Sequence, residues 1–344
     1  MILRNRYNIK GSVLKWIENW LKSRKQRVIL NGVSSDWLPI TSSVIQGSVL
    51  GVVLALLLLD SIDSVVRHCF LYKYADDNKL GMTIRSRNDV EKFQDDLNRV
   101  TKWTTSRKLR LNADKCSVIS FGNPKLPVSD LKLSIGGTEL KIITKEKDLG
   151  IIVDDNLSFS DHAQNQASKA MKALNHLKRN IITRKMNIWI NLYKVYVRPI
   201  FEYGLLSATP NLMSDMKTLE RVQRHATKQV SGIGNLEWSE RNRICGLLSI
   251  KDRIDRQTAV ETYKIINGLS LPSNDLIEMA VHTKSTRATT NENLVHSLPK
   301  MRICNTTFRC RAPKIWNSIW PSTRKSKTTS SFRIRYDEQF KNAS

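Results

Sequence analysis

The stretch LYKYADDNKL (residues 71–80) places two aspartates, Asp76 and Asp77, side by side in a sequence that otherwise reads as extended chain. The residues on either side, 70–75 and 79–84, favour two strands, so the aspartates should lie at the turn of a hairpin. Two carboxylates at one hairpin tip repel each other, and a hard divalent cation such as Mg²⁺ relieves that repulsion by binding both. The pattern predicts a metal-binding hairpin or, as the simpler alternative, a solvent-exposed acidic turn.

Helical patterns flank this hairpin on both sides. Residues 12–24 show amphipathic spacing, and the run from Val49 to Leu59 is apolar on every side, as expected of a buried helix. A third helix is predicted over residues 88–103, begun by a capping box of Asn88 and Glu91. The first part of the chain should therefore contain three helices that pack against strands.

Extended segments alternate with these helices up to about residue 155. A tight turn at Gly136-Gly137 indicates a second hairpin. Strands are predicted over residues 26–32, 70–75, 79–84, 116–122, 131–142 and 148–154. The combination predicts an α+β fold for this half of the chain.

After Ser160 the sequence predicts helices only. Two of them, over residues 161–180 and 216–230, place Ala, Leu and Val on one face and Lys and Arg largely on the other. Between them a helix is expected over about 187–198, ending before Pro199. The segment 281–330 is rich in Ser, Thr, Lys and Arg and is predicted to be loop with short helices around APKIWNSIW (residues 312–320).

The chain is strongly basic. It holds 56 Lys and Arg against 31 Asp and Glu, a formal net charge of +25, with clusters near residues 1–30 and 281–330. A polyanion would neutralise this excess, so nucleic acid is the expected partner, although a solvated basic face is the simpler explanation for any single cluster. The apolar run ending at Leu59 is about half as long as a membrane span needs. We expect no membrane partner and an intracellular protein, in nucleus or cytoplasm, that is not secreted.

Four motifs occur in a fixed order along the chain: VIQGSVLG (residues 44–51), YADD (74–77), LRLNADKCSVISFG (109–122) and KDLGIIVD (147–154). Together they resemble the reverse transcriptase of non-LTR (LINE-type) retrotransposons. Further segments are similar to the same family, namely GVSSDWLPITSSV (32–44), LYKVYVRPIFEYG (192–204), LERVQRHATK (219–228) and APKIWNSIW (312–320). The resemblance thus covers nearly the whole chain.

The resemblance implies an RNA-directed DNA polymerase with a particular domain order. The α+β part, residues 1–155, would be a truncated polymerase palm, an antiparallel sheet with packed helices. Residues 156–235 would be an all-α thumb, and residues 236–344 a basic C-terminal helical region. The implied partners are an RNA template, a DNA primer, the RNA/DNA duplex they form and deoxynucleoside triphosphates.

The resemblance also assigns roles around the acidic pair. Asp76 would bind the catalytic Mg²⁺, with Mn²⁺ as a possible substitute, and Asp77 would assist it. Gln46, Gly47 and Tyr74 would contact the template and the incoming nucleotide.

Two further motifs supply the remaining roles. Lys115 would protonate or screen the leaving pyrophosphate, for which the simpler alternative is a surface lysine. Leu149 and Gly150 would form the primer grip that holds the primer end.

The family's palm carries another metal-binding aspartate, on a strand well before the glutamine loop, and this sequence contains no matching segment. Ile45 and Val52 also replace prolines common in the family. Two hypotheses follow. The chain is either a reverse transcriptase fragment that is inactive alone or a non-catalytic, basic nucleic-acid-binding remnant; a maturase-like RNA-binding protein on the same scaffold is a third alternative.

Overall fold

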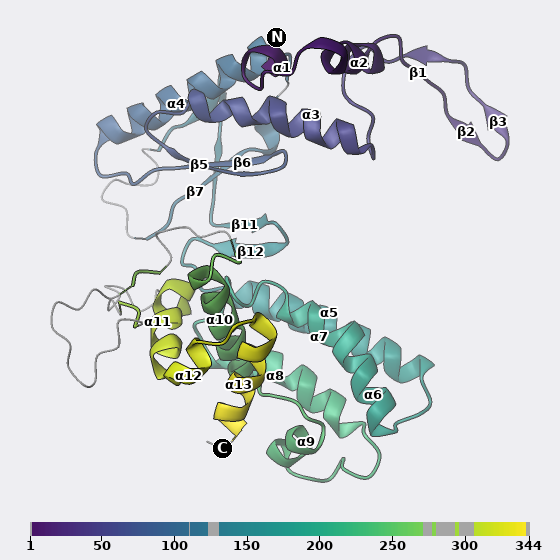
Figure 1. Cartoon of the computed structure of the whole chain (residues 1–344), viewed down its shortest axis with the longest axis vertical. Helices are drawn as coiled ribbons and strands as arrows, with labels where there is room; N and C mark the ends of the chain where they lie inside the picture. Colours follow the sequence, from purple (N-terminus) through teal and green to yellow (C-terminus); the bar gives the residue numbers. More distant parts are fainter. Residues whose placement is uncertain are drawn as a thin grey trace. The chain divides into compact units, whose positions relative to one another are not determined.

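A computed structural model describes residues 2–109, 111–122, 131–270, 277–279, 293–295 and 306–341 (Figure 1). The chain divides into two compact units, Met1–Ile143 and Thr144–Ser344, which we describe separately as unit 1 and unit 2. Within the described ranges, none of the helices combines the length and apolar character that a membrane crossing requires.

Unit 1 mixes helices with short strand pairs. Its helical segments are α1 (Ile2–Asn5), α2 (Gly11–Leu21), α3 (Val49–Asp60), the 3-10 turn η1 (Ser61–Ser64), α4 (Arg87–Ser106) and η2 (Ala113–Lys115). Its strands are β1 (Lys25–Gln26), β2 (Ile29–Leu30), β3 (Val33–Ser34), β4 (Leu38–Pro39), β5 (Phe70–Tyr74), β6 (Asp77–Gly81), β7 (Ser117–Ile119), β8 (Ser134–Ile135), β9 (Thr138–Glu139) and β10 (Lys141–Ile143). This mixture of helix and strand is what the sequence predicted.

The described strands of unit 1 pair two by two. Antiparallel pairs are β1 with β4, β2 with β3, β5 with β6, and β8 with β9, whereas β7 and β10 are parallel. The predicted hairpin at Gly136-Gly137 is confirmed as the β8–β9 turn. An antiparallel palm sheet built from these pairs stays a prediction.

Helix α4 contributes buried residues to both hydrophobic clusters of unit 1. Leu97, Val100 and Trp103 are buried along one face, as the sequence predicted. The predicted cap is wrong by two residues, because the capping box is formed by Ser86 and Asp89. Asp89 accepts hydrogen bonds from the backbone N–H of both residues that precede the helix, which Glu91 is too far along the helix to do.

Helix α3 forms where it was expected but is not a buried helix. Gly51 is its one buried residue, while 84% of Val49 and 58% of Val52 is exposed. A helix that is apolar on every side leaves apolar side chains on the surface whichever face it packs. The prediction from hydrophobicity was therefore right about the helix and wrong about its burial.

The described part of unit 2 contains one hairpin and a set of packed helices. The hairpin joins β11 (Lys145–Asp148) to β12 (Ile151–Asp154). The helical segments are α5 (Ser160–Asn180), α6 (Met186–Leu192), a π-helical turn (Tyr193–Val197), α7 (Arg198–Glu202), α8 (Met213–Lys228), α9 (Trp238–Ile244), α10 (Ile250–Ile266), α11 (Phe308–Ser318), α12 (Pro321–Arg324) and α13 (Thr329–Lys341).

The core of unit 2 lies mainly between α5, α6, α7 and α8. Ala170, Leu174 and Leu219 are among its fully buried side chains, on the faces that the sequence assigned to the interior. Helix α11 confirms the prediction of a short helix around residues 312–320, while most of the segment 281–305 lies outside the described residues.

The prediction that a helix ends before Pro199 is wrong. Pro199 lies in the first turn of α7, where a missing N–H costs nothing, and the π-helical turn precedes it.

Candidate functional site

The two neighbouring aspartates lie at the tip of the β5–β6 hairpin. Tyr74 pairs with Asp77 across the hairpin, so that Ala75 and Asp76 form the turn, with Ala75 in the left-handed conformation at φ 53°. Both aspartates are exposed. Within the part of the chain that the structure describes, neither carboxylate has an ion-pair or hydrogen-bond partner. The predicted hairpin is confirmed, but its turn lies one residue earlier than the predicted Asp76-Asp77, so Asp77 already belongs to β6.

The two faces of this hairpin differ in character. Successive residues of a strand point to opposite faces, so Asp77 shares one face with Tyr74, Tyr72 and Phe70. This aromatic face is exposed, with 65% of Tyr72 and 64% of Tyr74 accessible to solvent. The opposite face starts with Leu71, which packs against the core of unit 1.

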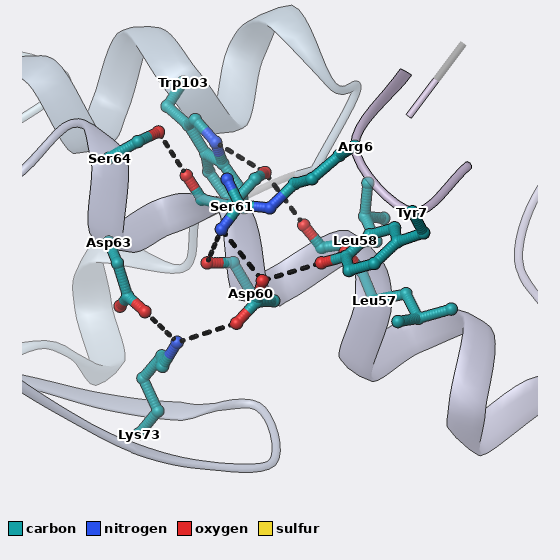
Figure 2. Close-up of polar contacts among 10 residues, drawn as sticks. All are labelled: Arg6, Tyr7, Leu57, Leu58, Asp60, Ser61, Asp63, Ser64, Lys73 and Trp103. Atoms are coloured by element: carbon teal, nitrogen blue, oxygen red, sulfur yellow. Dashed lines mark hydrogen bonds and ion pairs between the residues drawn. The ribbon is translucent and has the colours of Figure 1, made fainter. Parts of the chain in front are cut away.

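Lys73 extends from the packed face and fixes the hairpin to the end of α3. Its Nζ lies 2.6 Å from Oδ2 of Asp63 and 3.8 Å from Oδ1 of Asp60 (Figure 2). Because Lys73 and Asp77 leave the hairpin from opposite faces, these two carboxylates bind the side of the hairpin away from Asp77. They position the hairpin and do not complete the acidic pair at its tip.

Asp60 also binds the N-terminal segment. Its Oδ2 accepts hydrogen bonds from the Tyr7 hydroxyl at 2.7 Å and from Nη2 of Arg6 at 2.9 Å (Figure 2). These two hydrogen bonds, the one from Tyr7 first, hold the pKa of the Asp60 carboxyl below its usual value. The same contacts raise the pKa of both Tyr7 and Arg6. Asp60 therefore stays ionised, with two hydrogen-bond donors on Oδ2 and the Lys73 ammonium group 3.8 Å from Oδ1.

Ser61, directly after Asp60, connects this cluster to the core. Its Oγ accepts a hydrogen bond from Nε1 of the buried Trp103 at 3.2 Å and donates one to the Leu58 carbonyl at 3.1 Å (Figure 2). Sequence reasoning did not identify Asp60 or Asp63 as functional. Their only signal was the position of two acids directly after an apolar helix, and the donors that face them come from distant segments.

The other residues that the sequence assigned to nucleotide chemistry lie on exposed turns of unit 1. Gln46 and Gly47 form the turn before α3, with Gly47 at φ 83°, and Ser48 then caps the helix by accepting from the Gly51 N–H at 3.1 Å. Lys115 ends η2 and is exposed. No hydrogen bond or ion pair of the described residues joins Gln46 or Lys115 to the aspartates.

Leu149 and Gly150, the predicted primer grip, form the two-residue turn between β11 and β12 in unit 2. Both have left-handed backbone, at φ 45° and 83°. The Tyr203 hydroxyl donates to the Leu149 carbonyl at 2.6 Å, and a Cβ on Gly150 would lie 3.1 Å from Cε1 of Tyr203. The glycine is required both by its backbone conformation and by the nearby tyrosine ring.

A second acidic cluster in unit 1 is explained by backbone capping. His68, Asp95 and Asp96 bring their ligand atoms within 4.8 Å of one another. Among the described residues, no other group of three metal-ligating side chains lies this close together. The buried Asp96 carboxylate accepts three backbone N–H groups, those of residues 67, 68 and 69, at 2.7 to 3.0 Å. Arg99 donates to Asp95 at 2.9 Å. Because these donors already use the oxygens, the cluster fixes the chain entering β5.

Comparison with known proteins gives consistent matches. Residues 3–147 match the family model described as reverse transcriptase (RNA-dependent DNA polymerase). The chain is 25% identical, over 227 residues, to the RNA-directed DNA polymerase from mobile element jockey of Drosophila melanogaster, which covers 63% of this chain. It is 26% identical, over 133 residues and 38% of its length, to an uncharacterized protein of Caenorhabditis elegans.

The coverage of these relatives is partial. The aligned part is 25% of the Drosophila polymerase and 67% of the Caenorhabditis protein. The chain therefore spans about a quarter of the length of the polymerase it matches. No solved structure matches the chain.

Proposed function

Since this chain carries a reverse transcriptase domain of the non-LTR retrotransposon type, we propose that it is a nucleic-acid-binding part of an RNA-directed DNA polymerase that does not extend a primer by itself. The observation that carries the proposal is the β5–β6 hairpin. It presents Asp76 and Asp77 at an exposed tip, next to an aromatic face. A hairpin of this kind supplies oxygen ligands where a nucleic acid strand can reach them.

The acidic pair fits a divalent cation by the chemistry of its donors. Mg²⁺ prefers carboxylate oxygens and completes its shell with water and substrate phosphate. Asp76 and Asp77 would hold the ion, with Mn²⁺ as a substitute. When bound, such an ion stabilises charge on the reacting phosphate oxygens. The hairpin's own part is to fix the two carboxylates, through the contacts of Lys73 with Asp60 and Asp63.

The neighbouring residues would supply contacts to the nucleic acid. Tyr74 and Tyr72 offer exposed rings on which bases can stack. At Gly47 no atom lies within 4 Å of the position a Cβ would take, so the turn with Gln46 leaves room for a ligand against the backbone. The ammonium group of Lys115 is accessible and would screen the charge of a leaving pyrophosphate.

The lack of catalysis by this chain alone follows from the number of carboxylates. Two-metal phosphoryl chemistry uses ions about 4 Å apart, and the resemblance to the family implies a further carboxylate ligand beyond the hairpin tip. Among the described residues, Asp60 and Asp63 are the acids that contact the hairpin, and both are paired with Lys73 on its other face. The tip by itself provides two carboxylates.

Unit 2 favours duplex binding as the retained activity. Helix α5 buries its small and apolar residues and exposes Lys169, Lys172, Lys178 and Arg179. Helix α8 likewise exposes Arg221, Arg224, His225 and Lys228. Rows of cations on rigid helices bind the phosphate backbone without reading its sequence. The primer grip at Leu149 and Gly150 would hold the primer end of the same duplex.

A primer extension assay on an RNA template with Mg²⁺ or Mn²⁺ tests the proposal. We expect binding of an RNA/DNA duplex that weakens steeply with salt, and no extension. Extension abolished by the double substitution Asp76→Asn, Asp77→Asn would overturn the inactivity and support the metal site. Extension that survives the double substitution would overturn the role of the aspartates. Asp36→Asn, at an exposed aspartate outside this hairpin, is the matched control.

Metal binding can be measured without activity. Electron paramagnetic resonance of Mn²⁺ titrated with the chain should show a bound fraction that the double variant loses and the Asp36→Asn variant keeps. Equal Mn²⁺ binding by all three proteins would contradict the proposed ligands.

A further inference from the structure

Unit 2 contains a small cavity between α10 and α13. It has a volume of about 180 Å³ and is lined by Leu206, Arg256, Gln257, Val260, Glu261, Lys264 and Arg333. Arg256, Val260 and Lys264 are spaced four residues apart on α10, so they form one face of that helix. Arg333 reaches the cavity from α13. The lining therefore brings three cationic side chains from two helices around one space.

Each of the three cations keeps donors that no group of the described residues uses. Arg256 binds both oxygens of Asp337 through Nε and Nη2, at 2.6 and 2.8 Å, and its Nη1 makes no hydrogen bond with the described residues. Lys264 Nζ makes one contact, with Glu261 at 3.0 Å. The guanidinium of Arg333 has no ion pair or hydrogen bond within the described part of the chain. Donors on all three side chains are free to bind a ligand.

The charge balance of the lining is positive. Glu261 is its one acid, and it is already satisfied, because Oε1 accepts from the Ser270 hydroxyl at 2.6 Å and Oε2 from Lys264. Burial raises the pKa of Glu261, but these two hydrogen bonds outweigh that effect and hold the pKa below its ordinary value. Glu261 therefore balances Lys264, and Asp337, just outside the lining, balances Arg256. Among the described residues, Arg333 is the cation of the lining that no acid pairs with.

The two helices are held firmly together beneath the cavity. The ring of Phe332, next to Arg333 on α13, stacks on Tyr263 of α10 with ring centroids 4.5 Å apart. Both rings belong to one buried cluster with Trp316 and Tyr336. The Arg256–Asp337 ion pair adds a second link between the same helices. Arg256, Lys264 and Arg333 therefore extend from two helices whose relative position is fixed by this packing.

We propose that this cavity binds a phosphoryl group through Arg256, Lys264 and Arg333. A tetrahedral oxyanion is small enough for this volume, whereas a drug-sized ligand needs about 300 Å³ or more. Arginine and lysine donors are the groups that form charge-assisted hydrogen bonds with such an anion. The same chemistry is offered by a free phosphate ion, by a terminal phosphate of a nucleic acid and by its internal phosphodiesters. This site is separate from the β5–β6 hairpin and does not depend on polymerase chemistry.

Isothermal titration calorimetry with three probes tests the site: inorganic phosphate, a 5′-phosphorylated DNA tetramer and the same tetramer with a 5′-hydroxyl. We expect Arg333→Ala and Lys264→Ala each to weaken binding of the preferred probe about tenfold, since each removes a charge-assisted contact. Arg335→Ala is the matched control. It removes the same charge from the same helix, but Arg335 donates to the Ser322 carbonyl at 3.0 Å and does not line the cavity.

The three probes identify the source of the phosphoryl group. Preference for the phosphorylated tetramer assigns a terminal phosphate, equal binding of both tetramers assigns the phosphodiester backbone, and binding of phosphate alone assigns the free ion. Equal losses in Arg333→Ala and Arg335→Ala would overturn the proposal, because net charge alone would then explain binding. Failure of all three probes to bind would also overturn it. The Asp76→Asn, Asp77→Asn variant should bind like the unmodified chain, so this result is independent of the hairpin's function.

Discussion

Lys73 forms an ion pair with Asp63, in which Nζ lies 2.6 Å from Oδ2. This contact fixes the hairpin that carries Asp76 and Asp77 to the turn after α3. The side chain of Lys73 is 28% exposed, so the contact is partly shielded from water. Asp60 lies 3.8 Å from the same ammonium group and is itself bound to Arg6. Through these contacts the N-terminal segment, the end of α3 and the hairpin form one connected structure.

Replacing Lys73 by Met should loosen the hairpin while keeping the length of the side chain. An ion pair at this level of exposure contributes up to about 1 kcal/mol, so the urea midpoint should fall slightly. Mn²⁺ affinity at the tip should fall with it, because the two carboxylates are less well fixed. Lys73→Arg should restore both properties. A Met variant with unchanged Mn²⁺ affinity would show that the contact does not position the tip.

Trp103 is expected to be a main support of unit 1. It is 4% exposed, belongs to the cluster that includes Ile62 and Val100, and donates to Ser61. Trp103→Ala should lower the free energy of unfolding by about 3–5 kcal/mol, measured by urea denaturation. Trp16→Ala, at a tryptophan that is 58% exposed, should change it by no more than about 0.5 kcal/mol. Similar losses in both variants would contradict the assigned core.

The sequence predicted local features well because they depend on neighbouring residues. Alternation around Asp76 and Asp77 specifies a hairpin, and the spacing of Leu97, Val100 and Trp103 specifies the buried face of α4. These patterns need no knowledge of the rest of the chain.

Features that depend on distant contacts were missed. Nothing near Asp60 in sequence indicates that Tyr7 and Lys73 surround it, and a uniformly apolar α3 gives no sign of which face stays exposed. The helix through Pro199 was also missed, because a π-helical turn places the proline in the first turn of α7, where it is tolerated.

The turn at Leu149 and Gly150 allows a paired test of backbone strain. Gly150→Ala forces a side chain into a left-handed position 3.1 Å from Tyr203 and should destabilise unit 2 by about 1–3 kcal/mol. Leu149→Asn should be neutral or slightly stabilising, because Asn tolerates the left-handed φ of 45° better than Leu. Urea denaturation monitored by circular dichroism distinguishes the two. If Gly150→Ala unfolds at the same midpoint as the unmodified chain, the turn has another conformation in solution.

His162 should make the stability of unit 2 depend on pH below neutrality. The ring is buried in the neutral form that the contacts require, with Nδ1 accepting from the Ile152 N–H at 3.3 Å and Nε2 placed to donate to the Tyr203 carbonyl at 3.1 Å. Burial lowers the pKa of His162, and the hydrogen bond to Tyr203 offsets this only in part. Between the lowered pKa of the folded state and about 6.5 in the unfolded chain, the unfolded state binds more protons.

Stability should therefore be complete above about pH 6.5 and fall as the pH decreases through this window. His162→Gln replaces the imidazole by an amide that can also donate and accept but does not titrate, so it should lower stability at pH 7.5 but flatten its dependence between about pH 5 and 7. Urea midpoints measured across that range give the comparison. His176→Gln, at an exposed histidine of the same helix, is the matched control for the substitution. An unmodified chain that is equally stable at pH 5 and pH 7.5 would contradict the neutral, buried imidazole.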